Sequence, residues 1–214
     1  MPDFSHTALP TLDNCIMNGA LLLALMQPPS SQEEEFNDWY DTEHFPQRLV
    51  LPGFLDGQRW VCSEGWPRYL ALYELENEDV LNTAQYLSVS GARSTPWSRR
   101  ILPRTVGRQR IVLRTCAEAR RPGQAASLLL MSWNMPAHVD MESFISTVDA
   151  QINTIAGVLT LQWGENLAPP VDRGRSLFLI ATFDYCIQSS ALDAMRRPLN
   201  VGCTHFNLYL PYCR

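Results

Sequence analysis

The sequence lacks long hydrophobic runs and any concentration of basic residues. Its most apolar run, residues 20–26, is far shorter than the ~20 residues that a membrane helix needs. No run of Lys or Arg exceeds two residues and the formal net charge is −5, so we expect no nucleic-acid partner. Asp3 and Asp13 lie in the N-terminal segment and no Lys or Arg precedes the apolar run, which argues against a signal peptide. We therefore expect a cytoplasmic protein.

Closely spaced cysteines are also lacking. No C-x-x-C occurs, and the only cysteine with a histidine within five residues is Cys203, before His205. Zinc sites need closely spaced ligand pairs, so we expect no metal and reduced, mostly buried thiols. No Walker loop, G-x-G-x-x-G or G-x-S-x-G is present, which leaves nucleotide cofactors and serine-hydrolase chemistry without support. The cysteines in question are Cys15, Cys62, Cys116, Cys186, Cys203 and Cys213.

What the sequence does contain is one series of elements that occurs twice. The first series has strands at 16–26, 54–62, 69–75 and 108–115, with helices at 32–49 and 78–90. The order β-α-β-β-α-β is the ferredoxin-like motif. The second series has strands at 127–134, 159–163, 176–183 and 204–210, with helices at 140–156 and 189–196. We expect a loose leader at 1–15, one repeat at 16–116, a linker at 117–126 and a degenerate repeat at 127–214.

Three local signals refine the first repeat. Ser31 with Glu34 three residues on predicts a capping box at the start of the first helix. Pro46 has no N–H and disfavours helical geometry at Phe45, so we expect a kink or a break there. Residues 95–105 are interpreted as an extended loop rich in arginine.

The two repeats can be laid over one another. Trp60 falls on Trp163, and residues 69–73 fall on residues 176–180. The similarity is weak, but it follows the order of the elements and indicates a duplicated unit.

Duplication has a physical purpose in this fold class. A four-stranded antiparallel sheet has one face covered by its own helices, and its other face must be buried by something else. We therefore expect an α+β fold in which two ferredoxin-like repeats pack sheet to sheet as an intrachain α+β barrel around a cavity. Aromatic strand residues are candidates to line that cavity: Trp60, Tyr69, Tyr73, Trp133, Trp163 and Phe178.

The first helix carries the most informative stretch. Tyr40 and His44 are four residues apart, as are Trp39 and Glu43, so one helical stripe offers a phenol, an imidazole and a carboxylate. Imidazole exchanges a proton near neutral pH, a carboxylate can orient it, and a phenol can stabilise an oxyanion. The corresponding helix after Phe144 has no His, Trp or Tyr, which places the chemistry in the first repeat. We expect the His44 ring to face the hollow between the two sheets.

At this point the residues resemble a known family. Residues 37–46, followed by Leu51-Pro52-Gly53-Phe54, resemble the EthD-like branch of the dimeric α+β barrel superfamily, and residues 69–75 and 95–100 fit the same group. The resemblance covers about residues 16–115 and is faint beyond them. The resemblance implies a ferredoxin-like pair that encloses a cavity, with His44 as the acid/base residue. It also implies catalytic roles for Tyr40 and Glu43, although less directly.

The family also sets the expected function. Its members include polyketide cyclases and dehydratases, muconolactone-type isomerases, hydroxynitrile lyases, cofactor-free monooxygenases and haem-binding proteins. We expect a cofactor-independent lyase, cyclase or isomerase that acts on a hydrophobic, oxygenated aromatic or polyketide-like molecule. A homodimer is compatible with this family. The expected substrate-binding residues are Trp39, Trp60, Tyr69, Tyr73, Trp97 and Arg99, with Arg100 beside them.

Two alternatives stay open. One is a monooxygenase of the same fold, either cofactor-free or dependent on haem, for which His44, His138 and His205 are candidate axial ligands and His6 lies in the leader. The other is a non-catalytic protein that binds a hydrophobic metabolite, because fold alone does not fix function.

Overall fold

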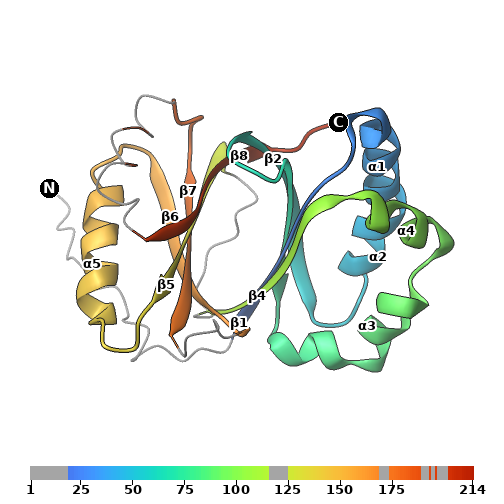
Figure 1. The fold of residues 1–214 in the computed structure, drawn as a ribbon, viewed down its shortest axis with the longest axis horizontal. Helices are drawn as coiled ribbons and strands as arrows, with labels where there is room; N and C mark the ends of the chain where they lie inside the picture. The colour runs from blue at the N-terminus through green and yellow to red at the C-terminus, as the bar shows by residue number, and fades with distance from the viewer. Residues whose placement is uncertain (1–18, 116–124, 169–173, 189–192, 194–195, 197–201) are drawn as a thin grey trace, which may run out of the picture.

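The computed structural model describes residues 19–115, 125–168, 174–188, 193, 196 and 202–214. Eight antiparallel strands form one closed barrel in the order β1-β3-β2-β8-β5-β7-β6-β4 (Figure 1). The strands are β1 (Gly19–Gln27), β2 (Phe54–Glu64), β3 (Tyr69–Leu75), β4 (Val106–Thr115), β5 (Ser127–Met135), β6 (Val158–Asn166), β7 (Arg175–Phe183) and β8 (Cys203–Pro211).

The barrel consists of two ferredoxin-like halves. Strands β4-β1-β3-β2 form one half and β8-β5-β7-β6 form the other, in the same spatial order. The halves join at both edges, where β2 pairs with β8 and β4 pairs with β6. Each edge strand thereby gains a hydrogen-bonding partner within the same chain, which removes the exposed edges of an open sheet. The α+β class and the intrachain barrel of two repeats are confirmed.

Helices cover the outside of the barrel wall on two opposite sides (Figure 1). The long helix α5 packs against the second half, and a group of short helical segments packs against the first half. In chain order the segments are η1 (Ser30–Gln32), α1 (Glu33–Trp39), η2 (Tyr40–His44), α2 (Phe45–Leu49), η3 (Glu78–Asn82), α3 (Ala84–Ser88), η4 (Gly91–Arg93), α4 (Pro96–Ile101), η5 (Leu102–Arg104) and α5 (Met141–Ile152).

The interior of the barrel is packed with side chains. Leu21, Leu23 and Leu25 point inward from β1, where they join a cluster that we call the barrel core, while Leu22 points outward to the helices. This alternation is the period of two that a strand imposes. Trp60 and Phe178 lie in the barrel core as expected. Among the described residues, leucine and aromatic side chains occupy the space where we predicted a hollow between the sheets.

The other four aromatic candidates face outward. Tyr69 and Tyr73 pack under the helices of the first half, in a cluster that we call the first helical layer. Trp133 and Trp163 pack under α5 in the corresponding second helical layer. Their placement in a space between the sheets was therefore wrong.

The predicted overlay of the halves was out of register by one residue at β3 and β7. Leu72 faces the barrel core, whereas Leu179, its overlaid partner, faces the second helical layer. Trp60 and Trp163 likewise face opposite sides of the barrel wall. A shift of one residue reverses every side chain of a strand, so the true equivalents lie one position away.

Several helical details differ from the expectations. No side-chain cap forms at the start of η1 or α1, so the capping box of Ser31 and Glu34 was wrong. Thr83 interrupts the predicted helix 78–90, where it is extended and caps α3. Residues 95–105 are mainly helical rather than extended, because Thr95 accepts a hydrogen bond from Ser98 N and starts α4.

The leader 1–15, most of the linker 117–126 and most of the short helix 189–196 lie outside the described residues. The division into units at these boundaries stays a prediction. Within the described part of the chain, no helix has the length and apolar character to cross a membrane.

Candidate functional site

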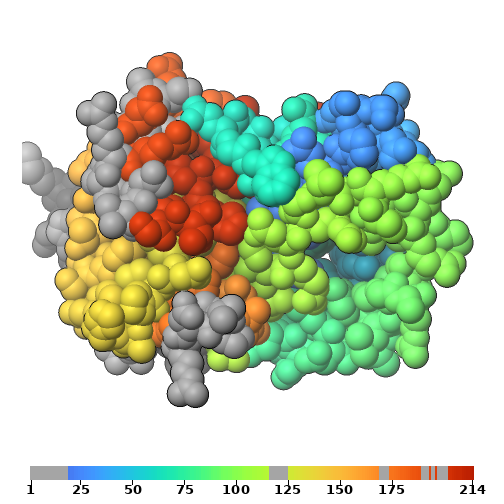
Figure 2. Space-filling model, in the orientation of Figure 1, coloured from blue at the N-terminus to red at the C-terminus, as the bar shows by residue number. Residues whose placement is uncertain are grey.

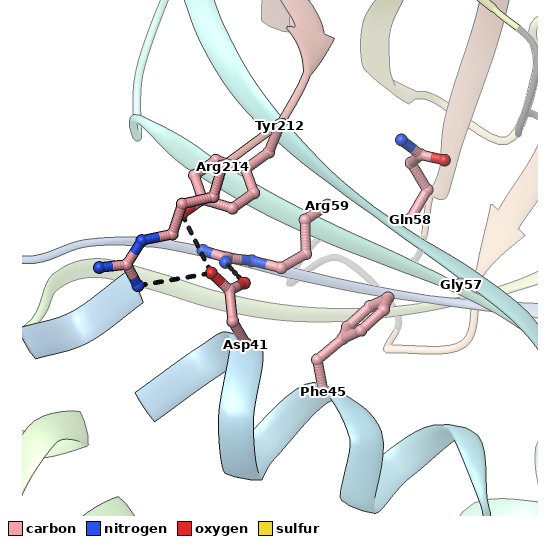
Figure 3. Close-up of a pocket in the computed structure, with 7 residues that line it drawn as sticks. All are labelled: Asp41, Phe45, Gly57, Gln58, Arg59, Tyr212 and Arg214. Carbon is pink, nitrogen blue, oxygen red and sulfur yellow. Dashed lines mark hydrogen bonds and ion pairs between the residues drawn. The ribbon is translucent and has the colours of Figure 1, made fainter. Parts of the chain in front are cut away.

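Two hollows lie on either side of the η2 segment, and their polar groups differ. The first is an open groove of about 340 Å³ lined by Asp41, Phe45, Gly57, Gln58, Arg59, Tyr212 and Arg214 (Figure 3). The Asp41 carboxylate pairs with Arg59, accepts a hydrogen bond from the Tyr212 hydroxyl at 3.2 Å and lies 3.7 Å from Arg214 Nη1. Its charge is therefore already matched within the chain.

Arg59 in this groove supports the neighbouring helix from behind. It is only 6% exposed, and its guanidinium carbon lies 4.4 Å from the Tyr40 ring and 4.0 Å from the Tyr212 ring. Its Nη2 donates to Asn37 Oδ1 at 2.7 Å. The guanidinium is satisfied by aromatic faces, an amide and a carboxylate, which fixes Tyr40 in place.

The second hollow is a cavity of about 430 Å³ between the helices and the outer face of the first half of the barrel. We call it the helix-side cavity. Figure 2 shows a hollow among the atoms of α3, η4, α4 and β4, with α2 behind it. Its lining residues come from β1, η2, α2, β3, α3, the segment around η4, η5 and β4: Leu22, Ala24, Leu25, Met26, His44, Arg48, Tyr73, Tyr86, Ser90, Gly91, Ser94, Leu102, Arg108, Gln109 and Arg110.

A π-helical turn brings His44 to this cavity. In η2 the Phe45 N–H bonds to the Tyr40 carbonyl, five residues back. This widened turn ends just before Pro46, whose ring would clash with the carbonyl of Thr42 in a regular α-helix. The expected kink thus takes the form of a π-turn, which is a documented cause of helix bending.

The wider turn also changes which side chains meet. The ring centroids of Trp39 and His44, five residues apart, lie 4.5 Å from each other, and those of Tyr40 and His44 lie 5.2 Å apart in an edge arrangement. The contact of Tyr40 with His44 is the predicted one. The closer contact of Trp39 with His44 was missed, because α-helical spacing pairs Trp39 with Glu43 instead.

Polar atoms without partners gather at this cavity. Three lining residues carry a buried polar atom that makes no hydrogen bond of normal geometry: His44 Nδ1, Arg48 Nη1 and the Tyr73 hydroxyl. The Tyr40 hydroxyl next to them is in the same state, although it lies close enough to Tyr73 to shift the pKa of that phenol. Buried polar atoms in folded proteins nearly always have partners, so these groups are available to a ligand or a water molecule in the cavity.

Burial controls the charge state of these groups. Burial first, then the charges of Arg48 and Arg59, lowers the pKa of His44 from 6.5 to about 3. Burial also raises the pKa of Tyr40, and it raises the pKa of Tyr73 well above its usual value. At neutral pH the site therefore holds a neutral imidazole, which can accept a proton, and neutral phenols, which can donate hydrogen bonds.

The described hydrogen-bond contacts of Glu43 are with Thr95 and Ser98. Its Oε1 accepts a hydrogen bond from Thr95 Oγ1 and lies 3.5 Å from Ser98 Oγ, so the carboxylate ties η2 to α4. Trp39 takes part in the same tie, since its Nε1 donates to Ser98 Oγ at 3.1 Å. These contacts support Glu43 as a positioning residue rather than as the orienter of the imidazole.

The other predicted substrate-binding residues are spread over the fold. Tyr69 bonds to Asn37 and Glu33, and the Trp97 Nε1 donates to Glu35 at 3.3 Å. Arg99 is exposed on α4 and is not among the residues that line either hollow. Of the predicted residues, the structure brings together His44, Tyr73, Tyr40 and Trp39, while Trp60 lies on the other side of the barrel wall.

Sequence reasoning missed the arginines of the helix-side cavity. Arg108 and Arg110 alternate along β4 and share its outward face with Val112, and Arg48 lies one helical turn beyond His44. The alternation of Arg108 and Arg110 was readable in the sequence. What could not be read was that this face of β4 borders the same cavity as His44.

Haem and metal sites were tested against the described residues. His138 is exposed in a turn, and both ring nitrogens of His205 are engaged, by Ser132 Oγ at 2.6 Å and Gln109 Oε1 at 2.8 Å. Of these candidate ligands only His44 keeps a ring nitrogen without a partner beside a cavity. Iron bound there would compete with proton transfer for the same imidazole. Among the described residues, no group of three His, Cys, Asp or Glu side chains is placed to hold a metal ion.

Comparisons with known proteins agree on the fold. No family model matches the chain, and no curated protein matches it by sequence. Similar solved structures include a monooxygenase candidate from Lactobacillus acidophilus at 10% identity and TM-score 0.55, covering 91% of this chain and 93% of that one. An anthrone oxidase-like protein has 9% identity, TM-score 0.55 and 91% coverage of both chains. A haem-binding protein from Thermus thermophilus has 10% identity, TM-score 0.52 and 92% coverage of both.

These similarities show the fold of the protein. The chain has the fold of the dimeric α+β barrel proteins, with both ferredoxin-like halves in one polypeptide. Membership of the EthD-like branch stays a prediction.

Proposed function

We propose that the protein is an enzyme that removes a proton from an oxygenated aromatic molecule held in the helix-side cavity, with neutral His44 as the base. The observation that carries this proposal is the grouping of unpartnered His44 Nδ1, Arg48 Nη1 and Tyr73 hydroxyl at one cavity. The cavity volume of about 430 Å³ is in the range of small-molecule sites, and its floor is apolar.

The three groups have complementary roles in such a step. The imidazole of His44 accepts the proton from an acidic C–H or O–H of the substrate. The Tyr73 phenol stays protonated and donates a hydrogen bond to the oxygen on which negative charge develops. The Arg48 guanidinium stabilises the negative charge on the substrate oxygen. That negative charge also raises the pKa of His44, because it offsets the repulsion from Arg48 and Arg59.

Oxygenation is the reaction that we propose to follow. The carbanion of an aromatic CH2 group reacts with O2, and loss of water leaves a C=O group. One oxygen atom enters the product and the other leaves in water, so the substrate supplies all four electrons and no reductant is needed. The anthrone oxidase-like and monooxygenase-candidate neighbours favour this outcome over the lyase or isomerase reaction, which starts with the same proton transfer.

Oxygen uptake with anthrone as the probe tests the proposal. We expect the wild-type protein to consume oxygen and form the ketone, and we expect His44→Ala to lower kcat/KM by about 100-fold or more, the usual contribution of a general base. His138→Ala, at an exposed turn, is the control. Retained turnover in His44→Ala would overturn the assignment of the base.

Two further readouts separate the alternatives. Product without oxygen uptake would support a lyase or isomerase, and thermal stabilisation by anthrone without any product would support a binding protein. A Soret band in the purified protein that disappears in His44→Ala would support haem at this histidine.

A further inference from the structure

The charged side chains that line the helix-side cavity are arginines. Arg48, Arg108 and Arg110 line it, and none of its described lining residues is an aspartate or glutamate. No ion pair between described residues involves any of these three arginines. The whole chain has a formal net charge of −5, so a cluster of three cations without a described acidic partner is opposite in sign to the chain as a whole.

Arg48 places a buried positive charge directly at the cavity. It is 6% exposed, its Nη2 donates to the carbonyl of Val89 at 3.0 Å, and its Nη1 is buried without a partner. A buried cation normally has a counter-charge or a full set of acceptors, because taking it out of water is costly. The missing acceptor lies at the cavity that Arg48 lines.

Tyr86 organises the cation cluster. Its ring lies 5.3 Å from the guanidinium carbon of Arg48 and 5.9 Å from that of Arg110, and its hydroxyl accepts from Arg110 Nη2 at 3.4 Å. Phe54 stacks on Tyr86 at 6.0 Å, so the ring is held from the apolar side. One fixed aromatic ring therefore holds two guanidinium groups beside the same cavity.

We propose that the substrate of the helix-side cavity is an aromatic carboxylate, whose acid group is bound by Arg108 and Arg110 within the field of Arg48, while its ring lies against the apolar floor from β1. Guanidinium groups suit this ligand because their paired N–H donors match the two oxygens of a carboxylate. The inference rests on the proposed function for the location of the reacting group, but the binding of the anion is a separate property of the arginines.

Binding of a matched pair of probes tests the inference. The probes are 2-naphthoate and 2-naphthamide, which share a ring system and differ in charge. Isothermal titration calorimetry should show 2-naphthoate binding at least about tenfold more tightly than the amide, a difference of 1.4 kcal/mol. The preference should weaken as salt is raised, because charge pairs near the surface are screened.

The variants Arg108→Gln and Arg110→Gln locate the effect. Both side chains belong to exposed residues, so we expect folded proteins in which the preference for 2-naphthoate shrinks several-fold. Arg104→Gln makes the same charge change at an exposed residue outside the cavity lining and should leave the preference intact. A competition titration with inorganic phosphate tests whether any anion binds equally well. If phosphate displaces 2-naphthoate only when it is in excess, the site prefers an aromatic carboxylate.

The failure of this inference can be told apart from that of the proposed function. His44→Phe should lose turnover and keep the preference for 2-naphthoate. Equal binding of the two probes, absence of 2-naphthoate binding at millimolar concentration, or a preference unchanged in both arginine variants would overturn the anion site, whatever His44→Phe does to turnover.

Discussion

His44 combines a buried ring nitrogen with two nearby cations, and this combination should be measurable in the stability of the protein. The pKa is about 3 in the folded chain and 6.5 in the unfolded reference, so between these pH values the unfolded chain binds more protons. The free energy of unfolding should therefore fall as pH is lowered from 6.5 toward 3. The loss approaches about 1.4 kcal/mol per pH unit at most.

Denaturant unfolding of the wild type and His44→Phe at several pH values measures this. Phenylalanine keeps a ring against Trp39 and cannot titrate, so the variant should lose stability less steeply. Any contribution from His205, whose pKa burial also lowers, is common to both proteins and cancels in the difference. Parallel pH profiles would contradict a depressed pKa at His44.

Tyr73 and Tyr69 form a matched pair for the unpartnered hydroxyl. The Tyr69 hydroxyl accepts from Asn37 Nδ2 at 3.0 Å and donates to Glu33 Oε1 at 2.6 Å, whereas the buried Tyr73 hydroxyl makes no hydrogen bond of normal geometry and has the Tyr40 hydroxyl nearby. Tyr69→Phe should cost about 1–3 kcal/mol, and Tyr73→Phe should leave the stability within about 1 kcal/mol or raise it. Thermal and urea unfolding measure both. Equal losses would show that the Tyr73 hydroxyl is satisfied in the folded protein.

At the scale of elements, α4 holds the π-turn η2 in place. Thr95 Oγ1 accepts from Ser98 N, so it caps α4, and it also donates to Glu43 in η2. One hydroxyl thus joins two helical segments that are more than fifty residues apart in the chain.

Thr95→Ala should therefore have two effects. It should cost about 1–2 kcal/mol, as loss of a cap does, and it should speed amide hydrogen exchange in residues 40–44. Thr83→Ala removes the cap of α3, which has no hydrogen bond to η2, and serves as the control. Unchanged exchange in residues 40–44 of Thr95→Ala would contradict the tie.

At the scale of the whole molecule, the two halves share one barrel and one core. The barrel core contains residues of β1, β2, β3 and β4 together with residues of β5, β7 and β8. Neither half can bury its inward face without the other, so we expect a single cooperative unfolding transition.

Leu179→Ala tests this coupling from a distance. Leu179 is fully buried under α5, and its truncation should cost about 2–5 kcal/mol. Calorimetry should still show one transition, and probes in the first half should lose stability by the same amount. Leu159→Ala, at a residue that is 44% exposed, should change little. Two resolved transitions would show that the halves unfold independently.

The sequence predicted the strands better than the site. The third strand, residues 69–75, was predicted at its observed bounds, and the order of elements gave the barrel of two repeats. The contacts of His44 were only partly predictable, because Pro46 signals a break and does not say that the break is a π-turn. The contact of Glu43 with Thr95 could not be predicted, because the two residues are remote along the chain.

The sequence alone determined the order of the strands and helices and the alternation of side chains along each strand. A strand has a period of two, and each strand carries that pattern locally. Which face of each strand meets the other half was decided only by the tertiary structure. Strands such as β3 and β7 are apolar on both faces, so their pattern fits either orientation equally well. Pairing of the strands at both edges of the barrel selects one orientation for each strand. In that orientation, His44 and its cavity lie on the helix side of the barrel wall.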